Sequence, residues 1–335
     1  MSIDYTPKEV MALMNLVDTY KRWTNFQTKD DRSYEYYHPS EWGKCLRLQQ
    51  YKHLAWKGYI KVIHKELDST QLRLFDKGHG MHARWARYFA DMGVLRGIWQ
   101  CKNKSCYMFD DTGSLKKMST EEIAIIMKQG KSRRHGVGEK LGIFCPEKCI
   151  CGCQEFDYCE TPVADLSLGI RGSCDLIIDC SRLNENSFDG VRRTFDLRLL
   201  PRDGHVIVGD MKTIGKSAWD FQLGRKGPHH EYRIQLTVYA HILGCDYGVL
   251  MYENKNDSEM KWYKVERSDE WWAVIEWQAK KMREMAAHKE LPPPRYTKDS
   301  YSCKNCEFMK LCHKSAEWDN PVLDAKRKWF YKCLL

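Results

Sequence analysis

The chain has 335 residues, of which 43% are hydrophobic and 30% charged, which is ordinary for a soluble globular protein with a sizeable core. Its net charge of +9 favours a polyanionic partner, nucleic acid first, although charge alone proves little. The N-terminal residues "MSIDYTPKEV" lack the apolar region of a signal peptide. No window holds about 18 consecutive apolar residues, so the sequence predicts no membrane-spanning helix and no membrane partner.

The first hundred residues are predicted to be mainly helical. Residues 5–24 have the apolar spacing of an amphipathic helix. A second helix is expected over 40–56, with Ser40 as its N-cap, and a third is centred on 78–90. The composition then changes, because residues 99–160 are rich in cysteine and contain a helix-like stretch, 119–129, followed by a basic loop, "KQGKSRRHGVGEK".

The second half of the chain alternates strands and helices. Runs rich in Ile, Val and Leu predict strands within 164–179 and 205–214. A helix is expected over 229–244, two more strands over 247–254 and 261–267, and a long helix over 269–290. The proline run "LPPP" ends that last helix.

Two aspartates and a lysine stand out on the predicted strands. Asp210 and Lys212 lie two positions apart in "VIVGDMKT", so the period-2 alternation of a strand puts both on one face. Asp175 lies in or at the end of an earlier strand. Carboxylates suit Mg²⁺ or Mn²⁺, and a nearby lysine can stabilise charge that develops on a phosphate. Taken alone, a D-x-K pair is more often a solvated strand face, so its neighbours decide its meaning.

Fifteen cysteines without a secretion signal favour reduced thiols or metal sites over disulfides. Three of them, Cys303, Cys306 and Cys312, lie in "YSCKNCEFMKLC" near the end of the chain. A tetrahedral zinc ion or an iron–sulfur cluster normally takes four protein ligands, so this trio lacks one partner.

Four short motifs, in order, resemble those of the RecB-type PD-(D/E)XK nucleases, and most closely the iron–sulfur branch that includes Cas4, AddB and Dna2. The family pattern is a helix with G-x-x-x-H, a strand with G-x-x-D, a strand with (D/E)-x-K and a helix with Q-x-x-x-Y. Each motif is weak alone, but the order and the predicted elements agree. The matching residues are Gly78 and His82, Gly172 and Asp175, Asp210 and Lys212, and Gln235 and Tyr239.

This resemblance implies a role for each matched residue. Lys212 would assist the attacking water and the scissile phosphate, and Gln235 and Tyr239 would support the site or the DNA strand. The ligands of a Mg²⁺ or Mn²⁺ ion would be His82, Asp175, Asp210 and the carbonyl of Met211.

The resemblance also implies the missing cysteine. Iron–sulfur members of the family take one ligand from a helix near the N-terminus, and "KCLRLQQY" supplies Cys45. The implied [4Fe–4S] cluster would join the two ends of the chain, although spacing alone leaves a zinc site open. Its ligands would be Cys45, Cys303, Cys306 and Cys312.

The cysteines of residues 99–160 predict a zinc-ribbon-like insertion, with free cysteines in a loop as the alternative. The preferred ligands are Cys101, Cys106, Cys145 and Cys151, and Cys149 is able to replace either of the last two. Within this insertion, Lys131, Arg133 and Arg134 are candidate contacts to a DNA backbone, and a solvated loop is an equal alternative.

We therefore expect an α/β, restriction-endonuclease-like fold with a mixed sheet flanked by helices. Residues 1–98 would be its helical part, 99–160 the zinc-binding insertion, 161–290 the nuclease core and 291–335 the iron–sulfur segment and basic tail.

The expected function is metal-dependent DNA cleavage by an exonuclease acting on single strands or DNA ends, in recombination, repair or DNA processing. The alternatives are a DNA-binding adaptor with a vestigial site and an RNA-directed nuclease. No G-x-x-x-x-G-K-[ST] occurs, so unwinding would need a helicase or recombination partner. The expected location is the cytoplasm of a bacterium or of a phage-infected host.

Overall fold

The structure, a computed structural model, describes most of the chain. The described ranges are 8–27, 34–61, 67–103, 108–109, 115–116, 134–135, 141–149, 151–184, 186–188, 196–201, 205–315 and 321–331. No helix within these ranges is long and apolar enough to cross a membrane. The predicted helix at 119–129, Cys106, Lys131, Arg133 and the side chain of Arg134 lie outside what is described.

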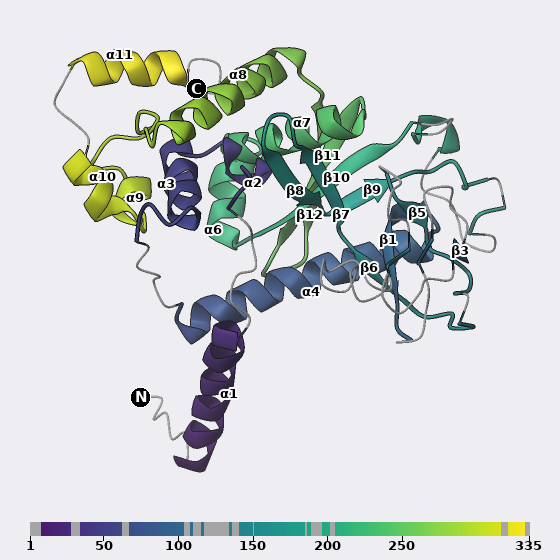
Figure 1. Cartoon of the computed structure of the whole chain (residues 1–335). Coiled ribbons are helices and arrows are strands. Elements are labelled where there is room, and N and C mark those ends of the chain that lie inside the picture. The colour runs from purple at the N-terminus through teal and green to yellow at the C-terminus, as the bar shows by residue number, and fades with distance from the viewer. Residues whose placement is uncertain are drawn as a thin grey trace.

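A mixed sheet of eight strands forms the centre of the molecule (Figure 1). Its main path runs in the order β12-β11-β10-β9-β1-β4, and β5 and β6 also pair with β1. Among the described strands of this sheet, β10 and β11 are parallel and the other pairs are antiparallel. The strands are β1 (Leu95–Cys101), β4 (Arg134–His135), β5 (Ile143–Phe144), β6 (Phe156–Cys159), β9 (Leu176–Ile178), β10 (Ile207–Ile214), β11 (Tyr247–Asn254) and β12 (Met260–Glu266).

Two short antiparallel pairs lie beside this sheet. Strands β7 (Thr161–Asp165) and β8 (Ile170–Cys174) form a hairpin, and β2 (Met108–Phe109) pairs with β3 (Leu115–Lys116). The β7–β8 turn closes through Asp165, whose Oδ1 accepts hydrogen bonds from Ser167 Oγ and from the backbone N–H of Leu168. Asp175 connects β8 to β9, so the hairpin feeds directly into the main sheet.

Helices cover the sheet on both faces and give it two hydrophobic cores. Helix α7 (His230–Leu243) packs Leu236, Tyr239 and Ala240 against strand residues such as Val208. Helix α4 (Ser69–Asp91) begins with a capping box between Asp68 and Gln71 and packs against β1, β9 and β10. The parallel pair β10–β11 needs a crossover, which consists of α6 (Lys216–Ala218), the π-helical η2 (Trp219–Leu223) and α7. A mixed sheet flanked by helices confirms the predicted fold class at this level.

The two ends of the chain meet in a third core. It contains α2 (Pro39–Trp42), α3 (Leu46–Trp56), α8 (Asp269–Ala287) and α11 (Pro321–Phe330). Gln278 joins them, because its Oε1 accepts from Trp42 Nε1 at 3.1 Å and its Nε2 donates to the Phe330 carbonyl at 2.8 Å. Figure 1 shows α9 (Tyr301–Lys304) and α10 (Met309–Ser315) beside α3, and α1 (Lys8–Gln27) projecting from the start of α4. The single-turn η1 (Leu197–Leu199) precedes β10.

The single helix predicted over 40–56 is wrong, since this segment forms two helices. Ser40 lies inside α2, and α3 begins after Cys45, which is its N-cap residue. Gly43 lies at the break, and a Cβ there would come within 2.3 Å of the Cα of Glu231, so the chain passes α7 at this point without a side chain. The break sets Cys45 at the start of a helix rather than in its middle.

Candidate active site and cysteine sites

Strand β10 brings an ion pair to the centre of the sheet. Lys212 Nζ lies 2.9 Å from Oδ1 and 2.8 Å from Oδ2 of Asp210, so both side chains share one face as the alternation predicts. Asp210 is fully buried, whereas the Lys212 side chain retains 21% of its exposure. Lys212 also lies over the ring of Tyr232 at 4.8 Å, a cation–π contact that fixes its direction.

Helix α7 supports the buried aspartate from one side. Gln235 and Tyr239 are one turn apart and therefore share a helix face. Gln235 Nε2 donates to Asp210 Oδ1 at 2.9 Å and to Tyr239 OH at 3.2 Å. These two residues are buried and hold the carboxylate in position, which places them as supports of the site.

Asp175 and His82 approach from other elements. Asp175 Oδ2 accepts a hydrogen bond from the Met211 backbone N–H at 2.9 Å, which ties the β8–β9 junction to β10. His82, on α4, brings Nδ1 to 3.4 Å from the same oxygen. Met211, whose carbonyl is expected to bind the metal, thus contacts Asp175 through its N–H. Its side chain is buried in the core under α4.

Glu160 completes the group, and the sequence reasoning missed it. One donor atom each from His82, Glu160 and Asp175 lies within 4.8 Å of the others, a spacing that can hold a metal ion. Glu160 joins β6 to β7, outside all four motifs. The register of the β7–β8 hairpin would have indicated Glu160. Its last pair is Thr161 with Cys174, and Glu160 and Asp175 are the residues directly beyond that pair.

Burial dominates the electrostatics of these carboxylates, and attraction to Lys212 is the largest influence that opposes it. Burial raises the pKa of Asp210 to about 6, opposed by the adjacent Lys212 and assisted by Asp175. The pKa values of Asp175 and Glu160 are also raised, again mainly by burial. Burial alone would lower the pKa of Lys212, but Asp210 and Asp175 outweigh it and raise the value.

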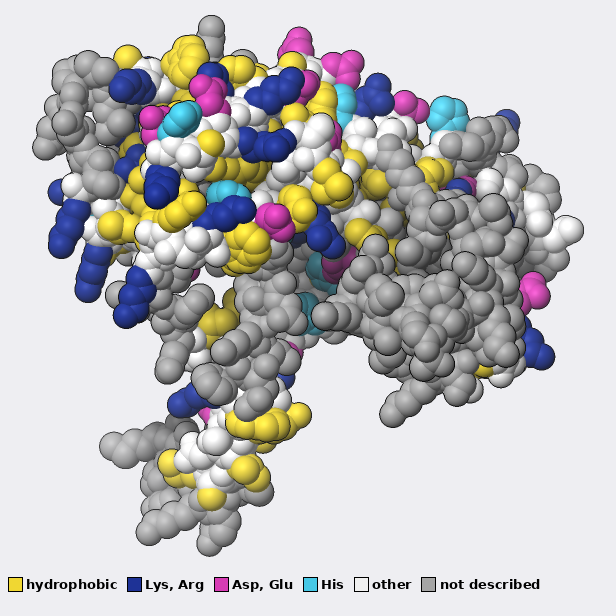
Figure 2. Space-filling view, viewed as in Figure 1, with side chains coloured by type: hydrophobic (Ala, Val, Ile, Leu, Met, Phe, Trp, Pro, Cys, Tyr) yellow, Lys and Arg dark blue, Asp and Glu magenta, His cyan; other side chains and the backbone are white. Residues whose placement is uncertain are grey.

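This donor set fits a hard divalent cation. The carboxylates of Glu160 and Asp175 converge with the His82 imidazole, and Lys212 lies close enough to attract both carboxylates. Oxygen-rich sites of this kind suit Mg²⁺ or Mn²⁺. In Figure 2, histidine and acidic side chains are visible in a hollow of the surface near the middle of the molecule.

The two motif glycines have different roles. Gly172 on β8 is required for packing, because a Cβ there would lie 2.8 Å from Cδ of Pro39 at the start of α2. Gly78 on α4 has open space around its missing Cβ, so packing among the described residues does not require it.

All four cysteines of the proposed iron–sulfur set line one cavity of about 130 Å³ between α3 and the segment that carries α9 and α10. Leu48, Tyr51 and Met309 contribute to its largely apolar wall. Cys45 Sγ accepts a weak hydrogen bond from the Arg295 N–H at 3.5 Å. Burial raises the pKa of Cys306 to about 11, and the neighbouring Cys45 and Cys312 add to this rise.

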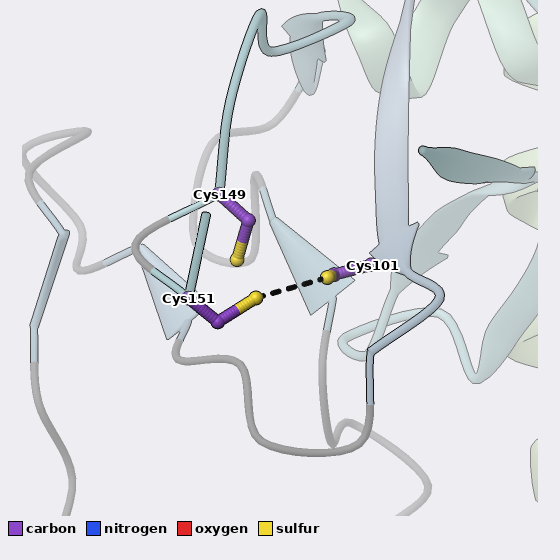
Figure 3. A group of neighbouring side chains, drawn as sticks. All are labelled: Cys101, Cys149 and Cys151. Atoms are coloured by element: carbon purple, nitrogen blue, oxygen red, sulfur yellow. Dashed lines mark hydrogen bonds between the residues drawn. The ribbon is translucent and has the colours of Figure 1, made fainter. Parts of the chain in front are cut away.

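The cysteines of the insertion are arranged differently (Figure 3). Cys101, at the end of β1, and Cys149 and Cys151 point their sulfurs toward one another, with all three within 4.8 Å. The Cys101 and Cys151 sulfurs are 3.6 Å apart, close to the spacing of about 3.8 Å that tetrahedral zinc with 2.3 Å bonds requires. Cys145 is exposed and lies outside this group, so the structure brings Cys149 rather than Cys145 to the other two.

Comparison with known proteins finds one family profile that matches part of the chain. Residues 188–313 match the profile of the PD-(D/E)XK nuclease superfamily, a range that includes Asp210, Lys212, Gln235 and Tyr239 but not His82, Glu160 or Asp175. No curated protein sequence matches the chain.

Two solved structures are similar at low identity. One is SSO0001, with 13% identity, a TM-score of 0.40, and coverage of 91% of this chain and 98% of that one. The other is an alkaline exonuclease from Laribacter hongkongensis, with 12% identity, a TM-score of 0.29, and coverage of 38% of this chain and 56% of that one. The similarity to the PD-(D/E)XK nuclease superfamily therefore lies in residues 188–313, less than half of the chain.

Proposed function

We propose that this protein is a metal-dependent nuclease that hydrolyses DNA phosphodiester bonds, as an exonuclease on single strands or DNA ends. The observation that carries the proposal is the grouping of His82, Glu160 and Asp175 beside the Asp210–Lys212 pair. A vestigial site in an adaptor would not need to keep this complete donor set together. The net charge of +9 supports a polyanionic substrate.

A bound Mg²⁺ or Mn²⁺ ion would supply Lewis acidity and an activated water. The residues of the chain would do the rest. His82 and Asp175 would hold the cation, and Asp210 fixes Lys212 through contacts of 2.8 and 2.9 Å. Because the pKa of Lys212 is raised, its ammonium stays charged and can stabilise the negative charge that develops on the phosphate.

The substrate class is tested with labelled nucleic acids. Single-stranded DNA, duplex DNA and RNA, each labelled at one end, are incubated with wild-type protein and Mn²⁺ or Mg²⁺, and with EDTA as the control. We expect stepwise shortening of DNA that EDTA abolishes. Internal cuts would indicate an endonuclease in place of an exonuclease. Faster cleavage of RNA would indicate an RNA-directed nuclease. If no substrate is cleaved, the protein would be a DNA-binding adaptor with a vestigial site.

The Cys45 cavity is proposed to hold a [4Fe–4S] cluster. The support is the number and spacing of its ligands: four cysteines surround one space, yet among the described residues they form no triad with all sulfurs within 4.8 Å. A single zinc ion would require such close spacing, whereas a cluster several atoms wide would not. The apolar wall would exclude water from the cluster.

Cys101, Cys149 and Cys151 are proposed to hold zinc in the insertion. Their close spacing supports a mononuclear site. Cys101 Sγ also accepts a hydrogen bond from the N–H of Asn103 at 3.4 Å, and such a bond stabilises a thiolate ligand. Elemental analysis tests both proposals together, and the expected result is protein that contains both iron and zinc.

A location in the cytoplasm of a bacterium or a phage-infected host, work in recombination or repair, and a helicase or recombination partner complete the proposal. They rest on the resemblance of the motifs. Co-purification of the tagged protein from a host lysate, followed by mass spectrometry, tests the partner, and an ATP-driven unwinding protein is the expected class.

A further inference from the structure

We infer that Glu160 is a ligand of the catalytic divalent cation, supplied to the active site by the cysteine-rich insertion. This inference rests on the proposed nuclease function, and it adds a residue outside all four motifs. Glu160 ends the connection from the insertion and enters the β7–β8 hairpin that leads to Asp175. Its carboxylate lies with His82 and Asp175 in a group whose donor atoms are all within 4.8 Å.

Two strand ladders fix the backbone of Glu160 from opposite sides. On one side, Cys159 at the end of β6 pairs with Ile98 of β1. On the other, Thr161 at the start of β7 pairs with Cys174 of β8. A residue held between two paired neighbours has little backbone freedom, so its Cα position is set before any ion binds.

The register also places Glu160 against Asp175. One step beyond the Thr161–Cys174 pair, the next two facing positions are Glu160 and Asp175. Side chains directly opposite each other in an antiparallel pair have Cβ atoms about 5 Å apart, and like charges there destabilise the pair. Lys212 already attracts both carboxylates, and a divalent cation between them would neutralise the charge that remains.

A further contact ties β6 to the same point. Tyr158, two residues before Glu160, donates its hydroxyl to the Asp175 backbone carbonyl at 2.9 Å. Its ring lies over Gly97 of β1, where a Cβ would come within 2.3 Å of it, so any side chain at that position would displace the ring. At the other end of this ladder, Phe156 pairs with Cys101 of the cysteine group. The strand β6 therefore contacts both Asp175 and the cysteine group, and it leads directly to Glu160.

The experiment measures Mn²⁺ binding by isothermal titration calorimetry on wild-type protein, Glu160→Gln, Glu160→Asp and Asp157→Asn. Asp157 is the matched control, because it is an acidic residue on β6 outside the metal group. Its side chain is 66% exposed and forms an ion pair with Lys102. We expect Glu160→Gln to weaken Mn²⁺ binding at least about 10-fold, Glu160→Asp to weaken it less, and Asp157→Asn to leave it unchanged.

Thermal unfolding provides a second readout that a purely structural role would move the other way. Without divalent metal, Glu160→Gln should raise the melting temperature by roughly 1–3 °C, because it removes a charge that faces Asp175. With Mn²⁺, the variant should gain less stability than wild type. A lower melting temperature without metal, or unchanged Mn²⁺ affinity, would overturn the inference.

Cleavage assays separate this inference from the proposed function. If wild-type protein binds Mn²⁺ through Glu160 but cuts no nucleic acid, the ligand assignment stands and the nuclease proposal fails. If wild-type protein cuts DNA and Glu160→Gln retains both its rate and its Mn²⁺ affinity, the nuclease proposal stands and this inference fails.

Discussion

The acidic site at the centre of the sheet and the cysteine cavity at the edge of the molecule are built in opposite ways. Asp210 is paired with Leu250 in the β10–β11 ladder, and Asp175 and Glu160 each lie between residues that are paired in strands. The cavity instead depends on Cys45 meeting a segment from near the other end of the chain. We therefore expect substitution of a charged residue in the acidic site to impair cleavage, and substitution of a cysteine in the cavity to weaken the contact between the two ends of the chain.

The largest expected effect is on stability, at the cavity. Cys45→Ser should lose iron and lower the free energy of unfolding by about 5 kcal/mol, the upper estimate for closing so long a loop. A melting temperature lower by roughly 10 °C, measured with iron content, checks this. Cys306→Ser should behave alike, and Cys145→Ser, which is exposed and outside the cavity, should keep its iron. Full iron content in Cys45→Ser would place the fourth ligand elsewhere.

The next largest effect is on cleavage, at the acidic site, where we expect activity to fall while metal content stays unchanged. Lys212→Met should slow cleavage at least about 100-fold, because it removes the charge that faces the developing phosphate anion. Iron and zinc contents should remain those of wild type, as measured by elemental analysis. Lys310→Met, an exposed residue on α10, is the control and should cut normally. A Lys212→Met protein with a wild-type rate would show that this lysine takes no part in catalysis.

The zinc group provides an intermediate case. Cys149→Ser should lose zinc and destabilise the protein by about 1–3 kcal/mol, because the β1–β6 ladder remains to hold the fold. Cys145→Ser should keep its zinc, since Cys145 is exposed and outside the group. Zinc loss from the second variant but not the first would reverse the ligand assignment.

The smallest effect concerns pH. The folded-state pKa of Asp210 is raised to about 6, so the folded protein binds this proton more tightly than the unfolded chain does. Stability contributed by that proton is present at low pH and is lost as pH rises through about 6. Between pH 5 and pH 7 the loss should be roughly 1.4 kcal/mol in protein without added divalent metal. Denaturant unfolding of wild type and Asp210→Asn measures it, and equal pH slopes would contradict it.

Much of the acidic site follows from local sequence rules. Period-2 alternation puts Asp210 and Lys212 together, and helical spacing puts Gln235 and Tyr239 together, as the structure has them. Glu160 does not follow from such rules, because its partner is set by an antiparallel register that local patterns do not reveal. The need for glycine at position 43 is not visible in the local sequence for a similar reason, because it depends on the approach of Glu231 from a distant helix.

The cysteines show the same limit. Spacing within "FCPEKCICGC" leaves the choice among its four thiols open, and only the fold brings Cys149 and Cys151 to Cys101. The sequence also predicts that residues 99–160 form an insertion apart from the core, whereas strands β1, β5 and β6 pair within the main sheet. Pairing between strands far apart in the chain decides both points.

The most direct test of the central claim is the initial rate at which wild type and Asp175→Asn shorten one end-labelled DNA strand in Mn²⁺. Asn keeps the size of the side chain and can still accept the hydrogen bond from Met211, so the fold should survive. We expect cleavage by wild type that EDTA abolishes, and a rate at least about 100-fold lower for Asp175→Asn. Equal rates for the two proteins would contradict the assignment of this acidic group as the active site.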